Sequence, residues 1–207
     1  MSCGLLVHPC IFSSQRRLLA PLTPLLLAAL VQRDRAAADR ALTGRFPSSE
    51  LVPPLMTDAL DFFLEIAAAG PESAVWGARA YISVDTRDIV GLGGFTGPPD
   101  ERGFVTMGYS VFPEFQRRGY ASEAAALALD YAFGSLALAE VVAFTTISNL
   151  RSRRVMERLH MRHDPADDFD HPALADGHPL RRHVLYRIGR ADHFNLFNER
   201  TRRRDAP

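Results

Sequence analysis

Residues 103–133 constrain what this chain can fold into more than any other stretch, because a strand, a loop and a helix follow one another there without interruption. Along Phe104–Phe112 the side chains alternate with a period of two, which is the pattern of a strand. Apolar residues then recur at positions 124, 127, 128 and 131, the i, i+3, i+4, i+7 spacing of one helix face. The intervening loop, Gln116–Ala121, therefore leads into the N-terminus of a helix.

This loop has the composition of an anion site. A helix N-terminus carries unpaired backbone N–H groups and a partial positive charge. Small residues at Gly119 and Ala121 let an anion approach those groups, and Arg117 and Arg118 add charge at the same place. A diphosphate is the ligand that fits best, and a plain strand-to-helix turn is the alternative interpretation.

The spacing Gln116-x-x-Gly119-x-Ala121 resembles the acyl-CoA pyrophosphate loop of the GCN5-related N-acetyltransferase (GNAT) superfamily. The flanking segments 108–111 and 119–124 resemble its RimJ/RimL-like branch, which acetylates ribosomal-protein N-termini. The resemblance implies acetyl-CoA as co-substrate, with backbone N–H groups near the end of the strand polarising the thioester carbonyl. The residues implied to hold acetyl-CoA in this part of the chain are Ser110, Val111, Phe112, Gln116, Arg117, Arg118, Gly119, Tyr120, Ala121 and Ser122.

A second motif follows the stretch Glu140–Ile147, whose composition is that of a strand buried on both faces. Asn149 and Ser152 share a helical stripe with three apolar residues, Val155, Met156 and Leu159. These two polar residues can have a purely structural role. In that interpretation residue 148 or 149 caps the helix, and the Ser152 hydroxyl donates to a carbonyl one turn back.

This second stretch is similar to the fourth helix of the same family. The resemblance implies that Asn149 holds the pantetheine arm or an ordered water, and that Ser152 protonates the departing thiolate. The family usually has Gly then Phe after the last leucine of this motif, whereas this chain has His160-Met161. His160 is therefore a packing residue, a partner of the helix C-terminal dipole, or a site residue.

The segment 163–179 concentrates five aspartates and three histidines between three prolines. One interpretation of this segment is a solvated loop. We expect no metal site, because neither a paired histidine spacing nor a cysteine supports one. In the family this region borders the acceptor groove, so the resemblance implies that it attracts a cationic amine and takes its proton. Asp170 and His171 are the candidate catalytic bases, and Glu114 is the alternative.

The remaining pattern predicts an α+β fold: a single GNAT-like domain with a mixed, mostly antiparallel twisted sheet of about six to seven strands and about four helices. Thr23 and Pro24 start one helix and Pro54–Ala69 forms a second. Strands are expected at 16–20, 80–84, 89–95 and 184–188, in addition to the two described above. We divide the chain into an N-terminal extension (1–15), the acetyltransferase domain (16–190) and a basic C-terminal tail (191–207).

Composition limits the partners. The chain has 207 residues, 47% of them hydrophobic, which is enough for one domain. Basic and acidic residues number 24 each, so no global charge steers it to nucleic acid or an anionic membrane. The apolar stretch 18–31 is too short to span a bilayer and contains two prolines. Cys3 and Cys10 cannot form a disulfide framework or a metal set across a core, so a reducing cytoplasm is expected.

These features predict an N-acetyltransferase that transfers acetyl from acetyl-CoA to a primary amine. An α-amine is neutral at pH 7 in roughly one molecule in ten, but a lysine side chain in only about one in 2,500, so an α-amine needs less help from a base. No nucleophile motif indicates a covalent intermediate, which favours direct attack in a ternary complex. Peptide N-termini and small-molecule amines both fit as acceptors, and the protein is expected to be a monomer or a homodimer.

Two other classes of function remain open. A non-catalytic acyl-CoA sensor would keep the Gln116–Ala121 loop without needing Asn149 and Ser152. A ribosome- or RNA-associated module would explain the basic tail at 200–204, although the zero net charge argues against tight nucleic-acid binding.

Overall fold

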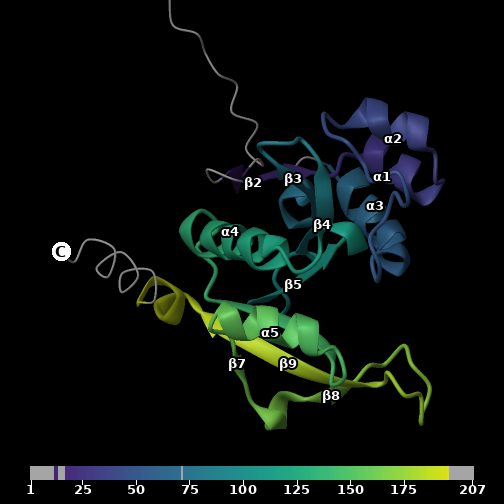
Figure 1. Ribbon diagram of the computed structural model, residues 1–207. Helices are drawn as coiled ribbons and strands as arrows, with labels where there is room; N and C mark the ends of the chain where they lie inside the picture. Colours follow the sequence, from purple (N-terminus) through teal and green to yellow (C-terminus); the bar gives the residue numbers. More distant parts are fainter. Residues whose placement is uncertain (1–11, 14–16, 71, 196–207) are drawn as a thin grey trace, which may run out of the picture. The chain divides into compact units, whose positions relative to one another are not determined.

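The computed structural model describes residues 12–13, 17–70 and 72–195. Among these residues the chain forms nine strands, five α-helices and four short 3₁₀ turns (Figure 1). The strands are β1 (Phe12–Ser13), β2 (Arg17–Pro21), β3 (Ala78–Ser83), β4 (Ile89–Phe95), β5 (Phe104–Val111), β6 (Glu140–Thr146), β7 (Arg162–His163), β8 (Phe169–Asp170) and β9 (Arg182–Gly189). The α-helices are α1 (Pro24–Val31), α2 (Arg35–Ala41), α3 (Leu60–Ala68), α4 (Tyr120–Gly134) and α5 (Leu150–Arg158).

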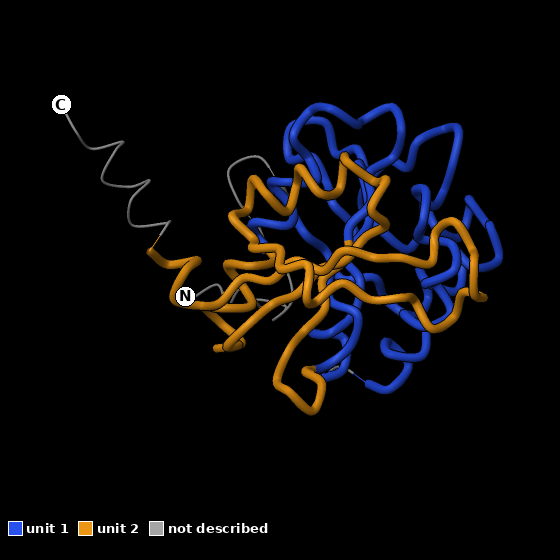
Figure 2. The backbone as a smooth tube through the Cα atoms, turned by 90° about the horizontal axis from the view of Figure 1, so that it is seen from below, with its two compact units in different colours: residues 1–98, 109–127 blue, residues 99–108, 128–207 orange. Residues whose placement is uncertain are grey.

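The chain separates into two compact units, which Figure 2 shows in blue and orange. The first unit contains residues 1–98 and 109–127, and the second contains residues 99–108 and 128–207. Strand β5 and helix α4 are each divided between the two units, β5 after Gly108 and α4 after Leu127. The two units are described separately below.

The first unit is a sheet in the order β1-β2-β3-β4-β5, with helices packed on its strands. Strands β1 to β4 pair antiparallel. One face carries Ala80, Ile82 and Leu92, which pack in one core with residues of α1 and α3 such as Leu30 and Phe63. The opposite face carries Leu19, Tyr81 and Val90, which cluster with Ala124 of α4. Because successive side chains of a strand point to opposite faces, the helices on each face pack against a separate set of apolar side chains.

The second unit is built on β6 and β9, which pair antiparallel along all of β6 and residues 183–189 of β9. Strand β5 joins β6 in parallel at Phe104–Thr106, and β7 and β8 each pair with β9. Residues that face each other across an antiparallel pair lie on the same side of the sheet. Tyr186 and Ala143 therefore share one side with Thr145, while Phe144 and Leu185 lie on the other.

Helix α5 ends in a Schellman motif, and His160 is the left-handed residue of that motif. The Met161 N–H donates to the Met156 carbonyl at 3.0 Å, and the His160 N–H donates to the Glu157 carbonyl at 2.9 Å. His160 has a φ of 59°, the left-handed conformation that glycine adopts most easily. The resemblance to the family anticipated a glycine at this position, and the backbone adopts the conformation that such a glycine would favour.

The predicted fold class is confirmed: the sheet is mixed and mostly antiparallel, with helices packed on its strands. The expectation that Glu140–Ile147 is buried on both faces is wrong, because Phe144 and Ile147 are 38% and 48% exposed. Only Val141–Ala143 at its centre are buried. The second predicted helix begins at Leu60 rather than Pro54, after a 3₁₀ turn at Thr57–Ala59, and α2 was not predicted.

Two features of the sequence lie outside the described residues: Cys3 and Cys10, and the arginine-rich tail at 200–204. In the part of the chain that the structure describes, no helix combines the length and apolar character needed to cross a bilayer.

Candidate active site

The loop Gln116–Gly119 turns from β5 into α4 through two left-handed residues. Arg117 has a φ of 63° and Gly119 a φ of 83°. A Cβ added at Gly119 would meet no atom closer than the Glu123 Oε1 at 3.8 Å, so the space beside this glycine is open to a ligand. Left-handed residues placed just before a helix turn successive N–H groups toward one side, as anion-binding loops do.

Charged groups surround this helix start. Arg117 and Arg118 are exposed, and the Arg118 guanidinium lies 5.9 Å from the centre of the Phe115 ring. Glu123 is the acidic residue of the first turn of α4 and is partly buried. Arg117, Arg118 and Glu123 together give the loop and the first helical turn a net positive charge, which favours an anionic ligand.

Successive backbone N–H groups at the end of β5 point alternately toward β4 and away from it. The Phe112 N–H donates to the Val90 carbonyl of β4 at 3.0 Å. Since neighbouring N–H groups along a strand point to opposite sides, the Val111 N–H points away from β4. The pairing of β5 with β6 ends at Thr106, although β5 continues to Val111. Among Ser110, Val111 and Phe112, Val111 is therefore the residue whose N–H is directed away from β4.

Side chains tie neighbouring loops to the end of β5. The Gln116 side chain donates to the Val111 carbonyl at 3.1 Å, which fixes the loop against the strand. The Ser110 hydroxyl donates to the Pro54 carbonyl at 2.5 Å. Ser49 donates to Glu114 at 3.2 Å, so this exposed carboxylate already has a hydroxyl partner. Gln116 and Ser110 therefore have structural roles at this site that the sequence did not reveal.

The N-terminus of α5 confirms the capping interpretation of Asn149. Its Oδ1 accepts from the Ser152 N–H at 3.2 Å, and its Nδ2 donates to the Thr145 hydroxyl at 3.0 Å. Both ends of the amide are thus engaged, although the oxygen has a second lone pair and the nitrogen a second hydrogen. Asn149 and Ser152 are both partly exposed, as a ligand-binding role requires.

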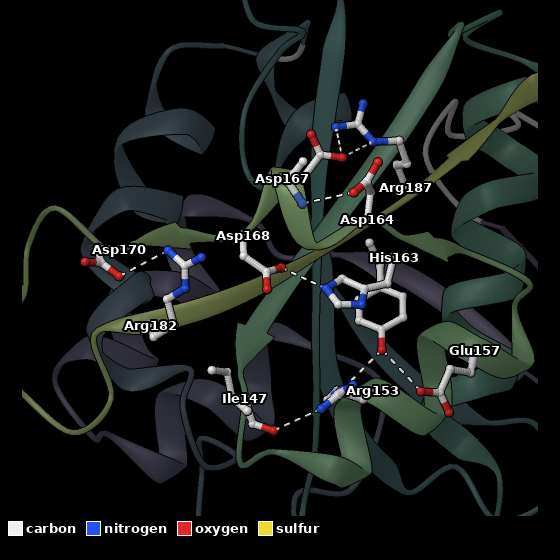
Figure 3. A network of polar contacts seen from close by, with 12 residues as sticks. Ile147, Arg153, Glu157, His163, Asp164, Asp167, Asp168, Asp170, Arg182 and Arg187 are labelled. Carbon is white, nitrogen blue, oxygen red and sulfur yellow. Dashed lines mark hydrogen bonds and ion pairs between the residues drawn. The ribbon is translucent and has the colours of Figure 1, made fainter.

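A network of polar contacts joins α5 to β9 and to the segment after β7 (Figure 3). Arg153 donates through Nε to the Tyr186 hydroxyl at 3.2 Å, and that hydroxyl donates to the Glu157 Oε1 at 3.2 Å. The His163 ring stacks on the Tyr186 ring with centroids 5.1 Å apart, and its Nε2 lies 2.8 Å from the Asp168 Oδ1. Residues from three elements thereby fix the helix that carries Ser152.

The aspartates of 163–179 are engaged within the second unit. Asp170 lies between two guanidinium groups, with oxygens 3.5 Å from Arg181 and 3.5 Å from Arg182. The others contact Arg187, His163, Arg181 or the backbone of their own turn. Because Asp167, Asp170 and Asp176 contact arginines, the loop attracts a cation less than its composition suggests.

His171 lies in a group of four rings with Phe144, Phe169 and His183. Its ring centroid is 5.1 Å from that of His183 and 6.1 Å from that of Phe144. Its Nδ1 accepts from the Ala173 N–H at 3.4 Å, which leaves the Nε2 of the partly exposed ring for another partner. The two candidate bases thus differ: Asp170 lies between two guanidinium groups, and His171 lies among rings.

Comparison with known proteins decides the family. The model of the acetyltransferase (GNAT) domain matches residues 16–162, which is more than half of the chain. The chain belongs to the GNAT acetyltransferase family. This acetyltransferase is 28% identical over 138 residues to the uncharacterized N-acetyltransferase YjdG of Bacillus subtilis strain 168, covering 66% of the chain and 79% of the relative.

Two solved structures with the same fold have names that refer to different acceptors. One is a proposed ribosomal-protein-serine acetyltransferase from Vibrio cholerae, with a TM-score of 0.59 and 17% identity over 86% of this acetyltransferase and 97% of that chain. Another is the spermidine/spermine N-acetyltransferase SpeG from Vibrio cholerae, with a TM-score of 0.62 and 13% identity over 89% of this chain and 99% of that one. At these identities the likeness establishes the fold alone.

Proposed function

We propose that this acetyltransferase transfers the acetyl group of acetyl-CoA to a primary amine by direct attack in a ternary complex. The observation that carries the proposal is the Arg117–Gly119 loop, which combines two left-handed residues, open space beside Gly119 and the start of α4. In a member of this family, such a loop is suited to the pyrophosphate of acyl-CoA. The other residues that the resemblance places near the pyrophosphate shape the loop or the first helical turn. They are Gln116, Arg118, Tyr120, Ala121 and Ser122.

The reaction requires the protein to polarise the carbonyl, to protonate the departing sulfur and to accept a proton from the amine. The neutral amine nitrogen attacks the thioester carbonyl carbon, a C–N bond forms and the C–S bond breaks. The nitrogen loses a proton to the base, and the sulfur takes a proton. We assign the Val111 N–H to the carbonyl oxygen, because it is directed away from β4 while the Phe112 N–H is used. We assign proton donation to Ser152, and contact with the pantetheine arm to Asn149, whose amide keeps one lone pair and one hydrogen in reserve.

The base is assigned to His171 in preference to Asp170. Asp170 is already ion-paired with Arg181 and Arg182, at 3.5 Å each. The partly exposed His171 ring forms no ion pair with a described residue, and its lone-pair nitrogen, Nδ1, meets only the Ala173 N–H at 3.4 Å. His171→Ala should therefore lower kcat/KM and Asp170→Asn should not. If neither variant lowers kcat/KM, Glu114 or an ordered water takes the role. We further propose a cytoplasmic location and a monomeric or homodimeric state.

An amine library tests the proposal directly. Purified protein is incubated with acetyl-CoA and single amines, including peptide N-termini, polyamines and small-molecule amines, and products are identified by mass. The chain contains no lysine, so acetylation of lysine side chains on the protein itself cannot imitate turnover. The expected result is one N-acetylated amine per CoA released, with initial-rate lines that intersect. Acetyl-CoA binding without any acetylated amine would instead support the non-catalytic sensor, and stable acetylation of the protein without amine would contradict direct attack.

A further inference from the structure

An open hollow of about 640 Å³ lies in the first unit, between the α1–α2 turn and the segment that leads to α3. Leu51, Val52 and Pro53 are buried and form its apolar part. Its polar lining is Arg33, Arg35, Ser48, Ser49, Glu50 and Thr57. It therefore combines an apolar surface with a few polar groups, which is typical of a binding site for a small molecule or a peptide end.

Both arginines of the hollow are held in place by the chain itself. Arg33 donates to the Thr57 hydroxyl at 3.0 Å, and Arg35 donates to the Pro47 carbonyl at 2.7 Å. These partners are neutral, and neither guanidinium forms an ion pair with a carboxylate of the described residues. A guanidinium has five N–H donors, so each keeps donors for a ligand. Glu50 is the acidic residue of the lining and is exposed. The lining thus carries two cations and one anion.

The hollow adjoins the end of β5. Pro54 lines it and accepts the hydrogen bond of Ser110, one residue before the proposed carbonyl-polarising N–H of Val111. Ser49 also lines it and donates to Glu114, just past the same strand end. Two contacts from the rim therefore lead to the place where the acetyl group is proposed to lie.

We infer that this hollow binds an anionic group of the acceptor, so that the substrate class is an amine that also carries a carboxylate or a phosphate. The inference rests on the proposed function, because it supplies the specificity of that same acceptor site. Guanidinium groups held by neutral partners gain charge-assisted hydrogen bonds to an anion, and Arg matches the geometry of carboxylate and phosphate oxygens. A cationic acceptor is disfavoured here, because its second charge would face Arg33 and Arg35.

Two matched pairs of acceptors test this and separate the two anions. Ala-Glu-amide is compared with Ala-Gln-amide, and O-phosphoethanolamine with ethanolamine. Binding is measured by calorimetry with and without acetyl-CoA, and turnover by CoA release. In the wild-type protein the anionic member of at least one pair should have a Kd and a KM about tenfold lower, as expected for one charge-assisted hydrogen bond. The pair that shows the preference identifies the anion.

Variants assign the preference to the hollow. Arg33→Gln and Arg35→Gln should each reduce the preference for the anion severalfold while acetyl-CoA affinity is unchanged. Arg40→Gln is the matched control, since Arg40 lies on α2, is exposed and does not line the hollow. Arg35→Lys keeps the charge and should keep part of the preference. If Arg35→Gln fails to fold, Arg33→Gln still tests the inference, because Arg33 is exposed and loses only an exposed hydrogen bond to Thr57.

The outcomes separate this inference from the proposed function. Equal affinity for both members of each pair, or an equal effect of Arg40→Gln, overturns the anion site even if amines are acetylated. Arginine-dependent binding of the anionic member without turnover of any amine leaves the anion site standing and removes the transfer reaction. Turnover confined to neutral or cationic amines removes the anion site alone.

Discussion

The Nε of Arg153 lies 3.2 Å from the hydroxyl of Tyr186, and this hydrogen bond joins α5 to β9. It raises the pKa of the Arg153 guanidinium, since the phenolic oxygen stabilises the charged form. The same hydroxyl donates to Glu157 one turn further along the helix. A single buried phenol therefore holds two successive turns of the helix that begins at Asn149.

Tyr186→Phe should destabilise the protein by about 1–2 kcal/mol, because it removes hydrogen bonds to two charged groups while it keeps the ring. Urea denaturation measures this loss. We also expect kcat to fall more than acetyl-CoA affinity, because α5 carries Ser152. Arg153→Met should reproduce part of both effects, whereas Arg154→Met, an exposed position on the same helix, should reproduce neither. Wild-type stability in Tyr186→Phe would mean that the network does not fix the helix.

Gly119→Glu should weaken acetyl-CoA binding by well over tenfold, because a carboxylate would occupy the space proposed for the pyrophosphate. Gly103 provides a matched control: its φ of 79° is close to the 83° of Gly119, and it also lies in open space. Gly103→Glu should carry the same backbone cost and leave affinity unchanged. Calorimetry on both folded variants decides the point, and equal affinities would exclude the loop from the site.

Ser152→Ala should lower kcat more than it weakens acetyl-CoA binding, since proton donation to sulfur is needed mainly in the transition state. A thiol has an ordinary pKa of about 8.5, so we expect a moderate rather than a total loss. Asn149 requires a separate comparison because it also caps α5. Asn149→Asp keeps the cap and Asn149→Ala loses it at a cost of about 1 kcal/mol. Similar kinetics of Asn149→Asp and wild type would limit Asn149 to capping.

Alkaline pH should destabilise the fold through Tyr81. Burial raises the pKa of its phenol far above the ordinary value, and Tyr109 adds to this effect. The folded state keeps the proton where the unfolded chain releases it, so this contribution is complete below about pH 10 and is lost as pH rises further. Unfolding free energy should fall by up to about 1.4 kcal/mol per pH unit from this group. Tyr81→Phe should fall less steeply between pH 9 and 11, and parallel curves would contradict the assignment.

His160→Gly should stabilise the protein by about 0.5–1 kcal/mol, because glycine adopts the left-handed conformation at the end of α5 without a Cβ penalty. His160→Ala keeps that penalty and serves as the control, so the difference between the two variants isolates the backbone effect. Thermal unfolding of the three proteins measures it. Catalytic parameters should stay at wild-type values, and a large loss of kcat in both variants would return His160 to the site.

The local elements that carry the proposed chemistry were predictable from sequence, because each has a local signal. The strand expected at 89–95, between two runs of turn residues, has the same bounds as β4, and the Thr23-Pro24 pair marked the start of α1. The Asn149 cap and the stripe of α5 also follow from spacing along the chain. In all these cases the residues that decide the structure are neighbours in the sequence.

Long-range pairings could not be predicted in the same way. Tyr186 looks like any inward-facing strand residue until Arg153 and Glu157 are placed beside it. In the sequence alone, residues 163–179 look like an acidic loop without partners. The arginines that contact these aspartates lie up to 20 residues further along the chain. Phe144 belongs to a β-branched and aromatic run that suggested burial, yet tertiary packing leaves it 38% exposed.

The way β5 and α4 are shared between the two units has a consequence for synthesis on the ribosome. The first unit includes residues 109–127, so its core cannot close when residue 98 emerges and must wait for another 29 residues. During this interval the apolar faces of β3 and β4 lack Phe112 and Ala124, which complete them. Unpaired strand edges and apolar surface are the features that chaperones bind and that promote aggregation. Ribosome stalling is therefore expected to be most damaging between these two points of the chain.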